Sequence, residues 1–269
     1  MSKAFRKNRS TMIFWHLFRP ILFSLVLLQA FSCSNSTGVV EGENPKLLIF
    51  TKTRAYRHEC IEPGVKAMQS WFAKRGITSI HSEDSLMFTP QKLKDFDVVM
   101  FFQTTGNVLD SLQQTAFMKY IQSGKGFVGI HSAADTEYDW PWFTELLGSR
   151  FADHPDIQSG VMIRVDSANG STALTTGIAT AHLPARWTRT DEWYNFKAVP
   201  KNVHVELMAD EATYTGGEMG ANHPMAWYHQ FDGGRAYYSA MGHTVENYQD
   251  TLLLEHFAKA VKWASGVRE

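Results

Sequence analysis

Short apolar runs alternate with amphipathic stretches through the first half of the chain beyond residue 45. The runs that have the length and composition of buried strands are 46–51, 79–82, 97–102 and 127–130. Between them, apolar residues recur at helical spacing over 61–74 and 111–123, and a glycine follows each of these stretches. Strands separated by helices of this length are typical of a parallel sheet. The pattern therefore predicts an α/β fold with a doubly wound, mostly parallel sheet.

The second half of the chain is less regular. Residues 139–148 predict a short aromatic helix that ends in a glycine, and alternating residues predict strands at 161–165 and 203–208. A hairpin with a glycine turn is predicted over 225–241, and an amphipathic helix over 252–264. Residues 46–266 are long enough to form one domain with a full hydrophobic core.

The first 33 residues resemble the signal peptide of a bacterial lipoprotein. Residues 1–20 contain basic residues and no acid, and a short apolar run follows at 21–28. The end of this segment resembles a lipobox, in which Cys33 would be lipidated. Residues 34–45 would then form a flexible tether. We expect the domain to be anchored to a membrane of the cell envelope and to face the periplasm or the exterior. An uncleaved amino-terminal anchor is the alternative.

The charge of the chain argues against nucleic acid as a partner, and its cysteine content argues against a fold held by disulfides. The chain has 26 Lys and Arg against 27 Asp and Glu, and every charged residue of 1–33 is basic, so the part beyond Cys33 is acidic. No basic surface is expected to attract nucleic acid. Cys60 is the only other cysteine in the sequence, which excludes a framework of intramolecular disulfides.

The stretch 126–135 is the strongest candidate for chemistry. A buried strand stops abruptly at His131, and small residues and Asp135 follow it. In an open parallel sheet, ligands bind beyond the carboxyl ends of the strands. We therefore expect His131 at the mouth of a crevice, where small neighbours let a substrate approach the backbone. The alternative is a histidine that only caps a core strand.

Six short motifs occur along the chain in a fixed order. They are Arg57-His58, Gly129-Ile130-His131-Ser132, Asp153-His154-Pro155, Asp191-Glu192-Trp193-Tyr194, His223-Pro224-Met225-Ala226-Trp227 and Gly242-His243. Together they resemble the ThuA-like family of the trehalose-utilisation type, over essentially the whole chain beyond the tether. The resemblance implies a flavodoxin-like fold of the class I glutamine-amidotransferase group. It also implies a carbohydrate substrate, such as a keto-disaccharide or a glycoside.

The comparison with glutamine amidotransferases also excludes an activity. Those enzymes place a nucleophilic cysteine on the turn where this sequence has His131, and Cys60 lies near the first predicted helix instead. A thiolate mechanism needs a cysteine at that turn with a base beside it. Glutaminase activity is therefore not expected. Ser132 is a weaker alternative nucleophile, because it stands one residue further on and the sequence shows no partner for it.

Five histidines share a setting, at the end of an apolar strand or in a loop rich in Gly, Pro or Asp. They are His58, His131, His154, His223 and His243. Imidazole titrates near neutral pH, so such a set is suited to proton transfer. The alternative for each is a structural histidine held by hydrogen bonds.

A metal site is the other interpretation of the same histidines. Two or three imidazoles and a carboxylate bind a divalent ion such as zinc, and His131, His154 and His243 are the candidate ligands. The sequence has no HExxH or similar paired spacing, so proton transfer and metal binding both stay open. Glu192 is the favoured carboxylate, because it stands beside two large aromatic residues whose burial would raise its pKa.

Residues around these motifs predict sugar recognition. Flat aromatic rings stack on the C–H faces of sugars, and polar side chains bind the hydroxyls. The candidate substrate-binding residues are Arg57, His58, Asp135, Trp140, His223 and Trp227. The sequence carries neither a GxGxxG motif after the first strand nor a P-loop to support a nucleotide cofactor.

These observations favour an envelope enzyme that acts on a small carbohydrate by acid–base chemistry, with or without one divalent metal. Hydrolysis, elimination and isomerisation all stay open. The candidate catalytic residues are His131, His154, Glu192 and His243. A sugar-binding lipoprotein without chemistry is the main alternative, and a scaffold within an envelope complex is the third. Whether the chain forms a homo-oligomer is left open.

Overall fold

The computed structural model describes residues 44–165 and 177–267. The predicted signal peptide, Cys33 and nearly all of the predicted tether therefore lie outside the described residues. Within the described residues, no helix combines the length and the apolar character needed to cross a membrane.

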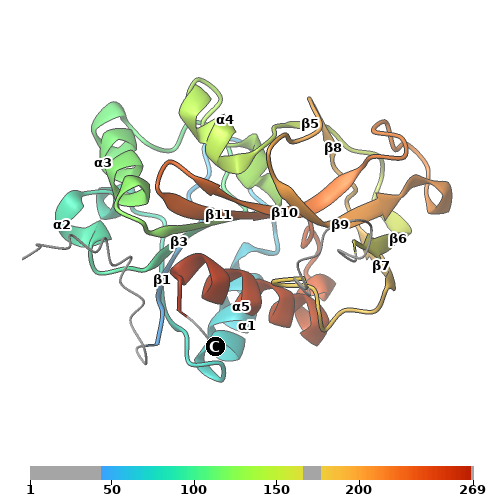
Figure 1. Ribbon diagram of the computed structural model, residues 1–269, viewed down its shortest axis with the longest axis horizontal. Coiled ribbons are helices and arrows are strands. Elements are labelled where there is room, and N and C mark those ends of the chain that lie inside the picture. Colours follow the sequence, from blue (N-terminus) through green and yellow to red (C-terminus); the bar gives the residue numbers. More distant parts are fainter. Residues whose placement is uncertain (1–43, 166–176, 268–269) are drawn as a thin grey trace, which may run out of the picture. The chain divides into compact units, whose positions relative to one another are not determined.

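A nine-stranded mixed sheet forms the centre of the described domain, with the strand order β2-β1-β3-β4-β11-β10-β9-β6-β7 (Figure 1). Five neighbouring strands are parallel: β2 (Thr78–Ser82), β1 (Lys46–Phe50), β3 (Val98–Phe102), β4 (Gly126–Ile130) and β11 (Gly234–Ser239). Four more extend the sheet with antiparallel pairing: β10 (Pro224–Phe231), β9 (His204–Asp210), β6 (Gln158–Arg164) and β7 (Arg186–Asp191). A separate two-stranded sheet pairs β5 (Phe151–Asp153) with β8 (Asn195–Phe196).

Helices cover both faces of the parallel half of the sheet (Figure 1). On one face lie α1 (Ile61–Ala73) and α5 (Thr251–Ser265), which contact each other. On the other face lie α2 (Pro90–Leu93), α3 (Ser111–Gln122) and α4 (Pro141–Leu147). Four short 3₁₀ segments complete the described elements: η1 (Ser85–Met87), η2 (His131–Asp135), η3 (Glu211–Thr213) and η4 (Glu246–Gln249).

Local sequence explains where the helices begin and end. Asp110 caps α3 and Gln113 bonds back to it, so the two side chains form a capping box. In α5, the Asp250 side chain accepts from the Leu252 N–H, and Gly266 ends the helix in the left-handed conformation. These caps satisfy main-chain groups that have no partner within the helix itself.

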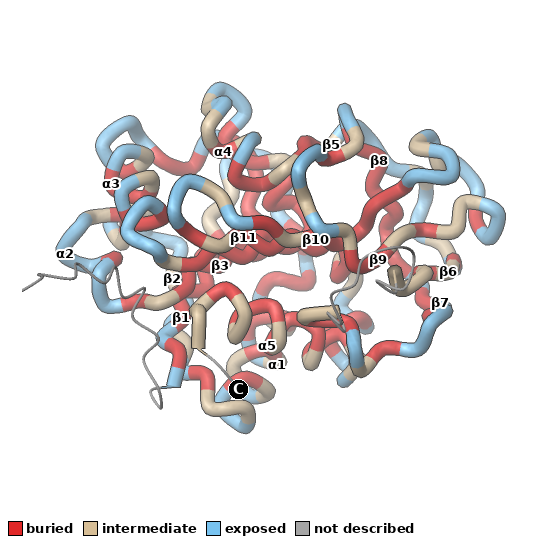
Figure 2. Tube along the Cα trace, viewed as in Figure 1, coloured by how far each residue is buried: buried red, intermediate tan, exposed pale blue. Residues whose placement is uncertain are grey.

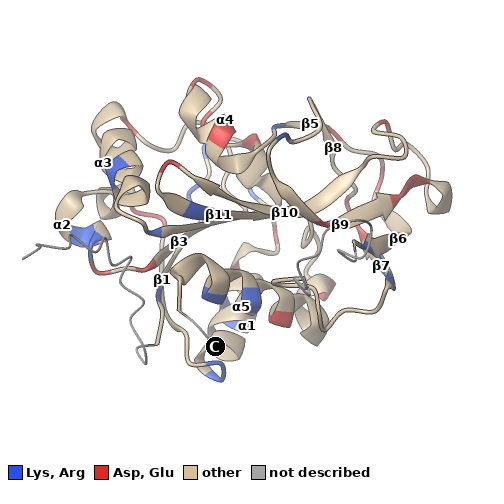
Figure 3. Cartoon of the chain, viewed as in Figure 1, with Lys and Arg blue, Asp and Glu red and all other residues tan. Residues whose placement is uncertain are grey.

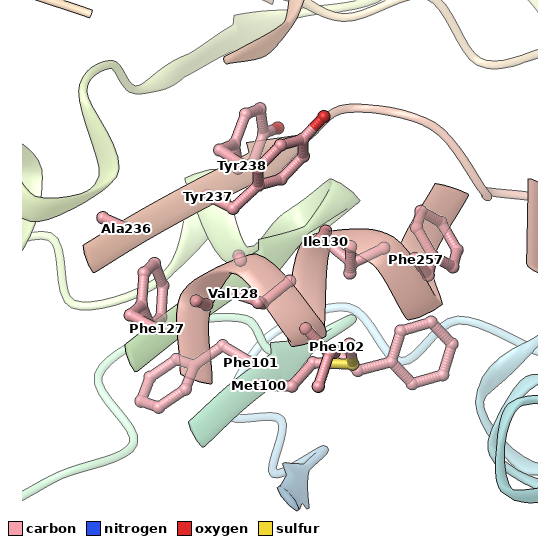
Figure 4. Close-up of a cluster of buried hydrophobic side chains, with 14 of the residues drawn as sticks. Met100, Phe101, Phe102, Phe127, Val128, Ile130, Ala236, Tyr237, Tyr238 and Phe257 are labelled. Carbon is pink, nitrogen blue, oxygen red and sulfur yellow. The ribbon is translucent and has the colours of Figure 1, made fainter. Parts of the chain in front are cut away.

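The core lies between the central strands and the helices on both sides, as the buried trace in Figure 2 shows. All five residues of β3 and of β4 are buried, as expected for strands covered on both faces. Figure 4 shows the aromatic side chains of Phe101, Phe127, Tyr237 and Phe257 among this cluster. Each such side chain contributes roughly 1.5–3 kcal/mol by leaving water. This packing fixes β4, and with it the turn that carries His131.

The fold confirms a single α/β domain and corrects the extent of its parallel part. The predicted strands and helices of the first half are all present within one or two residues. In the second half, β5, β7 and β8 were not predicted. The sheet is mixed because β10 pairs antiparallel with β11 and the strands beyond it continue this pairing, so parallel pairing is confined to the five strands from β2 to β11.

Candidate functional site

His131 occupies a sharp turn at the carboxyl end of β4. Its φ of 50° lies in the left-handed region, which non-glycine residues rarely adopt. The Tyr238 hydroxyl donates to the His131 carbonyl at 2.9 Å and anchors the turn. The imidazole is fully buried, and its Nδ1–H donates to the Ala240 carbonyl at 2.7 Å. Because a carbonyl can only accept, this bond places the proton on Nδ1 and leaves Nε2 with a lone pair when the ring is neutral.

Two further side chains meet His131 Nε2 from distant parts of the chain. Glu192 directly follows β7, and His243 follows β11 after a turn at Gly242. His131 Nε2 lies 3.2 Å from Glu192 Oε2 and 3.1 Å from His243 Nδ1. His243 Nδ1 in turn lies 3.0 Å from Glu192 Oε2. The three atoms therefore form a nearly equilateral triangle.

His58 completes the cluster from the loop after β1. Its ring stands edge-on to those of His131 and His243, with centroid distances of 5.2 and 4.9 Å. One potential ligand atom from each of His58, His131, Glu192 and His243 falls within 4.8 Å of all the others. Burial, together with the neighbouring imidazoles, lowers the pKa of His58 to about 2, so this ring is neutral. Its Nδ1 lies 3.5 Å from the Ser132 hydroxyl.

Glu192 is charged despite its burial. Burial by itself disfavours the carboxylate, but the imidazoles of His131 and His243 in contact with it outweigh that effect and hold the pKa of Glu192 well below its usual range. This result corrects the expectation from sequence that burial would raise it. The aromatic neighbour Tyr194 is present as expected, but its ring stacks on His131 at a centroid distance of 4.1 Å.

Asp191 fixes the two segments that carry Glu192 and His243. Its fully buried carboxylate accepts from the main-chain N–H groups of Gly242 at 2.9 Å and of Glu192 and His243 at 3.0 Å. The buried Arg189 balances its charge at 3.0 Å, and the Asn247 amide donates to it at 3.1 Å. One carboxylate thus holds the loop after β11 against the end of β7.

A cavity of about 310 Å³ opens beside the cluster. Its lining consists of Tyr56, His58, Thr105, Ser132, Asp135, Phe151, His154, Glu192, Tyr194 and His243. The described lining contains carboxylates and imidazoles but no lysine or arginine. In Figure 3, the labelled helices α2, α3 and α5 carry several of the described basic residues. The arrangement can pass protons between its members, or hold a cation between three nitrogens and an oxygen.

A family model described as ThuA, trehalose utilisation, matches residues 46–264, which is most of the chain. The chain belongs to the ThuA family. No curated protein matches the sequence significantly.

Solved structures share the fold of this ThuA chain. A ThuA-like protein from Bacteroides uniformis is 22% identical, with a TM-score of 0.66 over 85% of this chain and 94% of that one. Another from Parabacteroides merdae is 16% identical, with a TM-score of 0.67 over 83% and 90%. A β-galactosidase from Bacillus circulans sp. alkalophilus is 10% identical, with a TM-score of 0.52 over 84% of this chain and 32% of its own length. At these identities the likeness shows a common fold.

Five of the six ThuA motifs contribute side chains to the pocket region. Of the residues that the sequence predicted for the site, these motifs bring together His58, His131, His154, Glu192 and His243. Asp135, which follows the motif at 129–132, joins them. His154 lies at the rim with its side chain 41% exposed, and its Nδ1 is 3.2 Å from Glu192 Oε1. It is not part of the four-residue cluster, whereas His58 and Glu192 are.

The other expected substrate-binding residues do not line the pocket. Arg57 forms ion pairs with Glu62 at 2.6 Å and Glu83 at 2.7 Å. Trp140 stacks on Trp142 in the layer of α4.

The ThuA motif around His223 serves the core instead. His223 is fully buried, its Nε2–H donates to the Tyr194 carbonyl at 2.8 Å, and its Nδ1 lies 2.7 Å from Glu211 Oε1. Trp227 is also fully buried and donates to the Leu147 carbonyl at 2.8 Å. These contacts give both residues structural roles. Their places in the sequence alone could not show whether they serve the core or bind a ligand.

Several pocket residues had no assigned role in the sequence interpretation. Thr105 stands in a segment without a recognisable motif, so no local signal pointed to it, whereas Phe151 lies two residues before the Asp153-His154-Pro155 motif. The structural role of Asp191 could have been predicted from the sequence. An Asp-Glu pair at the end of an alternating strand places the first acid toward the core and the second beyond the strand.

Proposed function

We propose that this ThuA chain is an enzyme that performs acid–base chemistry on an uncharged carbohydrate in the pocket beside His131. The convergence of three imidazoles and one carboxylate beside a cavity, with three of the four residues in its lining, carries this proposal. The family description, trehalose utilisation, supports a carbohydrate as the substrate class. Hydrolysis, elimination and isomerisation of a disaccharide, a keto-disaccharide or a glycoside all use proton transfers of this kind.

The residues divide into those that would face the substrate and those behind them. Glu192 and His243 line the cavity, whereas His131 lies behind them and orients both. His154 connects Glu192 Oε1 with the solvent, so it would carry protons between the buried cluster and bulk water. Ser132 also lines the cavity, but its hydroxyl donates to Gln103 Oε1 at 3.1 Å, which is not the arrangement of an activated nucleophile.

The lining favours an uncharged substrate. Asp135 and Glu192 are the carboxylates of the described lining, and a phosphorylated sugar would meet them with no basic residue among the lining to neutralise it. Asp135 and Thr105 would bind sugar hydroxyls. The rings of Tyr56 and Phe151 would stack on the sugar, in the role that the sequence gave to Trp140 and Trp227.

Incubation of the purified full-length chain with unphosphorylated disaccharides, glycosides and their keto derivatives tests this proposal. We expect a product from at least one of them and none from the matching sugar phosphates. His131→Ala should bind the same sugar without converting it. Turnover by a well-folded His131→Ala protein at the wild-type rate would contradict the proposal.

A sugar-binding protein without chemistry is the second candidate. It is favoured by Tyr56 and Phe151, whose rings line the pocket and can stack on a sugar without any chemistry. This candidate predicts affinity without product, and affinity that is lost on replacing the two rings but retained on replacing His131 or His243. The same sugar panel distinguishes the two candidates.

We further propose that residues 1–33 are a lipoprotein signal with Cys33 as the lipidated residue, and that the domain lies in the cell envelope. The sequence pattern of 1–45 supports this placement. Cys33→Ser should move the protein from the membrane fraction to the soluble fraction. A wild-type protein found wholly in the soluble fraction would contradict it.

The finer fold assignment is also a proposal. The order β2-β1-β3-β4-β11 of the parallel strands agrees with the flavodoxin-like order, which supports a doubly wound sheet related to the class I glutamine amidotransferases.

A further inference from the structure

We propose that His58, His131, Glu192 and His243 bind one divalent metal ion of the zinc type. The proposal concerns the pocket of the proposed enzyme and rests on that function only for the role of the ion in catalysis. Binding of the ion follows from the geometry of the four side chains and is tested separately.

The hydrogen bond at the back of His131 is the first reason. Because Nδ1–H donates to the Ala240 carbonyl, the neutral ring presents a lone pair on Nε2 toward Glu192 and His243. Histidines that bind metals are oriented by the same kind of bond, from the remote ring nitrogen to a carbonyl or a carboxylate. His131 is thus already in the tautomer that a metal requires.

The triangle of His131 Nε2, His243 Nδ1 and Glu192 Oε2 is the second reason. All three edges measure 3.0–3.2 Å, and the Glu192 oxygen belongs to a carboxylate that accepts only. If only His243 Nδ1 carries a proton, the lone pair on His131 Nε2 faces the Glu192 carboxylate. If His131 Nε2 and His243 Nδ1 both carry protons, these two protons face each other along the edge between the nitrogens. A single cation in contact with all three atoms would attract the two nitrogen lone pairs and the carboxylate at once, so that none of the three atoms needs a proton from another.

The spacing agrees with a zinc site. Tetrahedral coordination with bonds of about 2.0–2.1 Å separates ligand atoms by roughly 3.3–3.4 Å. The observed edges are shorter by a few tenths of an ångström, which small rotations of the side chains would accommodate. His58 supplies a fourth nitrogen within 4.8 Å of the other ligand atoms. Three imidazoles and one carboxylate favour zinc or a similar transition metal over magnesium or calcium, which prefer oxygen ligands.

The surroundings hold the ligands in place and leave them accessible. Asp191 accepts from the main-chain N–H groups of both Glu192 and His243 and so fixes the segments that carry two ligands. His58, Glu192 and His243 line the cavity, which gives an ion and a substrate a common route. When bound, the ion would lower the pKa of a bound water or polarise a sugar oxygen.

Calorimetric titration of the tag-free full-length chain with Zn²⁺, after treatment with a chelator, tests the site. We expect one equivalent of Zn²⁺ to bind with saturation, and Mg²⁺ not to compete. Co²⁺ should bind at the same place and give the visible absorption bands of a low-coordinate site with nitrogen ligands. Failure of both Zn²⁺ and Co²⁺ to bind with saturation would overturn the proposal.

Variants identify the ligands. His131→Ala and His243→Ala should each weaken Zn²⁺ binding by more than the roughly 10- to 100-fold that loss of a hydrogen-bond partner of a ligand costs. Glu192→Gln keeps the side-chain shape and one oxygen and should also weaken it, which covers the case in which an alanine variant fails to fold. Unchanged affinity in a folded His243→Ala protein would overturn the assignment.

Two controls separate this site from other histidines. His204→Ala removes an exposed imidazole on β9 that stacks on Tyr228, and Zn²⁺ affinity should not change. His154→Ala removes the rim histidine and should leave one equivalent bound, because His154 lies outside the four-residue cluster. Loss of Zn²⁺ in His154→Ala but not in His243→Ala would contradict the proposed ligand set.

Asp191 is a positioning residue in this proposal, and Asn247→Ala probes it gently. Loss of the Asn247 amide removes one donor from Asp191 and the oxygen that accepts from Arg189 at 2.5 Å, but it keeps the ion pair between Arg189 and Asp191. We expect Zn²⁺ affinity to fall by about 10- to 100-fold, with an altered Co²⁺ spectrum. A stability loss with unchanged affinity and spectrum would contradict the positioning role.

The metal proposal and the proposed function can fail independently. Full sugar turnover by chelator-treated protein that binds no Zn²⁺ would overturn the metal site and leave acid–base catalysis in place. Tight Zn²⁺ binding with no product from any sugar would support the site and contradict the enzyme.

Discussion

Two groups of buried or partly buried histidines occupy different parts of this domain. One group surrounds the pocket at the ends of the parallel strands, and the other lies within the packed regions of the sheet and helices. The pocket group consists of the buried His58 and His131 and the partly buried His243, and the packed group of the buried His223, His229 and His256. Burial alone does not distinguish them, because His131 and His256 are both fully buried.

The direction of the ring nitrogens separates the two groups. In the packed group, His229 donates to the Leu146 carbonyl at 2.8 Å, and His256 donates to the Ala179 carbonyl at 3.1 Å and contacts the Ser239 hydroxyl at 3.3 Å. The nitrogens of His229 and His256 therefore pair with the main chain or a hydroxyl, and Nδ1 of His223 pairs with the carboxylate of Glu211 at 2.7 Å. In the pocket group, nitrogens of different rings point at one another and at Glu192. Convergence of nitrogens, rather than burial, marks the candidate site.

The largest expected effect tests the pocket group. His131→Ala should lower kcat/KM for the sugar substrate by at least about 100-fold, because it removes the residue that orients Glu192 and His243. Steady-state kinetics with circular dichroism as the folding check measures this change. His204→Ala, on the exposed face of β9, serves as the matched control and should retain the wild-type rate. Equal losses in both variants would remove the distinction between the groups.

The packed group should show the opposite behaviour. His256→Ala leaves a cavity in α5 and an unpaired Ala179 carbonyl, so the free energy of unfolding should fall by about 2–4 kcal/mol. Turnover per folded molecule should not change. Urea denaturation combined with kinetics on the folded fraction checks both values. A large loss of turnover with wild-type stability would place His256 in the functional group.

The pH dependence of stability sharpens the comparison. Burial lowers the pKa of His256 to about 3, compared with about 6.5 in an unfolded chain. The unfolded state therefore takes up a proton first as the pH falls, and His256 destabilises the fold progressively between pH 6.5 and about 3. The slope is about 1.4 kcal/mol per pH unit for one histidine.

Urea denaturation at several pH values measures this slope. His256→Ala should unfold with a shallower dependence on pH in that window than the wild-type chain. Parallel curves for the two proteins would show that His256 does not resist protonation in the folded state.

The smallest effect concerns the aromatic wall of the pocket. Phe151 lines the cavity and contacts Tyr194 at a ring-centroid distance of 4.4 Å. Phe151→Leu keeps an apolar side chain but removes the ring, and KM should rise about 2- to 10-fold with little change in kcat. Phe231→Leu makes the same replacement beside Trp142, away from the pocket lining, and should not change KM. A lowered kcat with unchanged KM in Phe151→Leu would assign that ring to the chemistry instead of binding.

The parallel half of the sheet and the turn at His131 were determined by the sequence itself. The apolar runs that became β1, β3 and β4 can be stable only if both of their faces are covered, and the helical spacing between them provides the cover. A strand buried in this way must end at the edge of the sheet. The change from apolar residues to the polar His131 therefore located the candidate site from the neighbouring sequence alone. The ThuA motifs added the other histidines.

The antiparallel half of the sheet was decided by pairing over long distances. β7 alternates buried and exposed residues, but two of its three buried positions are the charged Arg189 and Asp191, which pair with each other and with Asn247 from a distant segment. Such partners cannot be known before the strands are placed together. The same limit explains why Trp227 and His223 were expected at the pocket and are found in the core.

Only the tertiary structure decided which histidines converge. The sequence supplied five imidazoles in similar settings, and spacing along the chain carried no information about which of them meet. Packing of β4, β7 and β11 brings His131, Glu192 and His243 to within 3.2 Å of one another, although 51 to 112 residues separate them along the chain. Which acceptor each ring nitrogen finds depends on main-chain carbonyls such as that of Ala240, whose direction is fixed only when the sheet has formed.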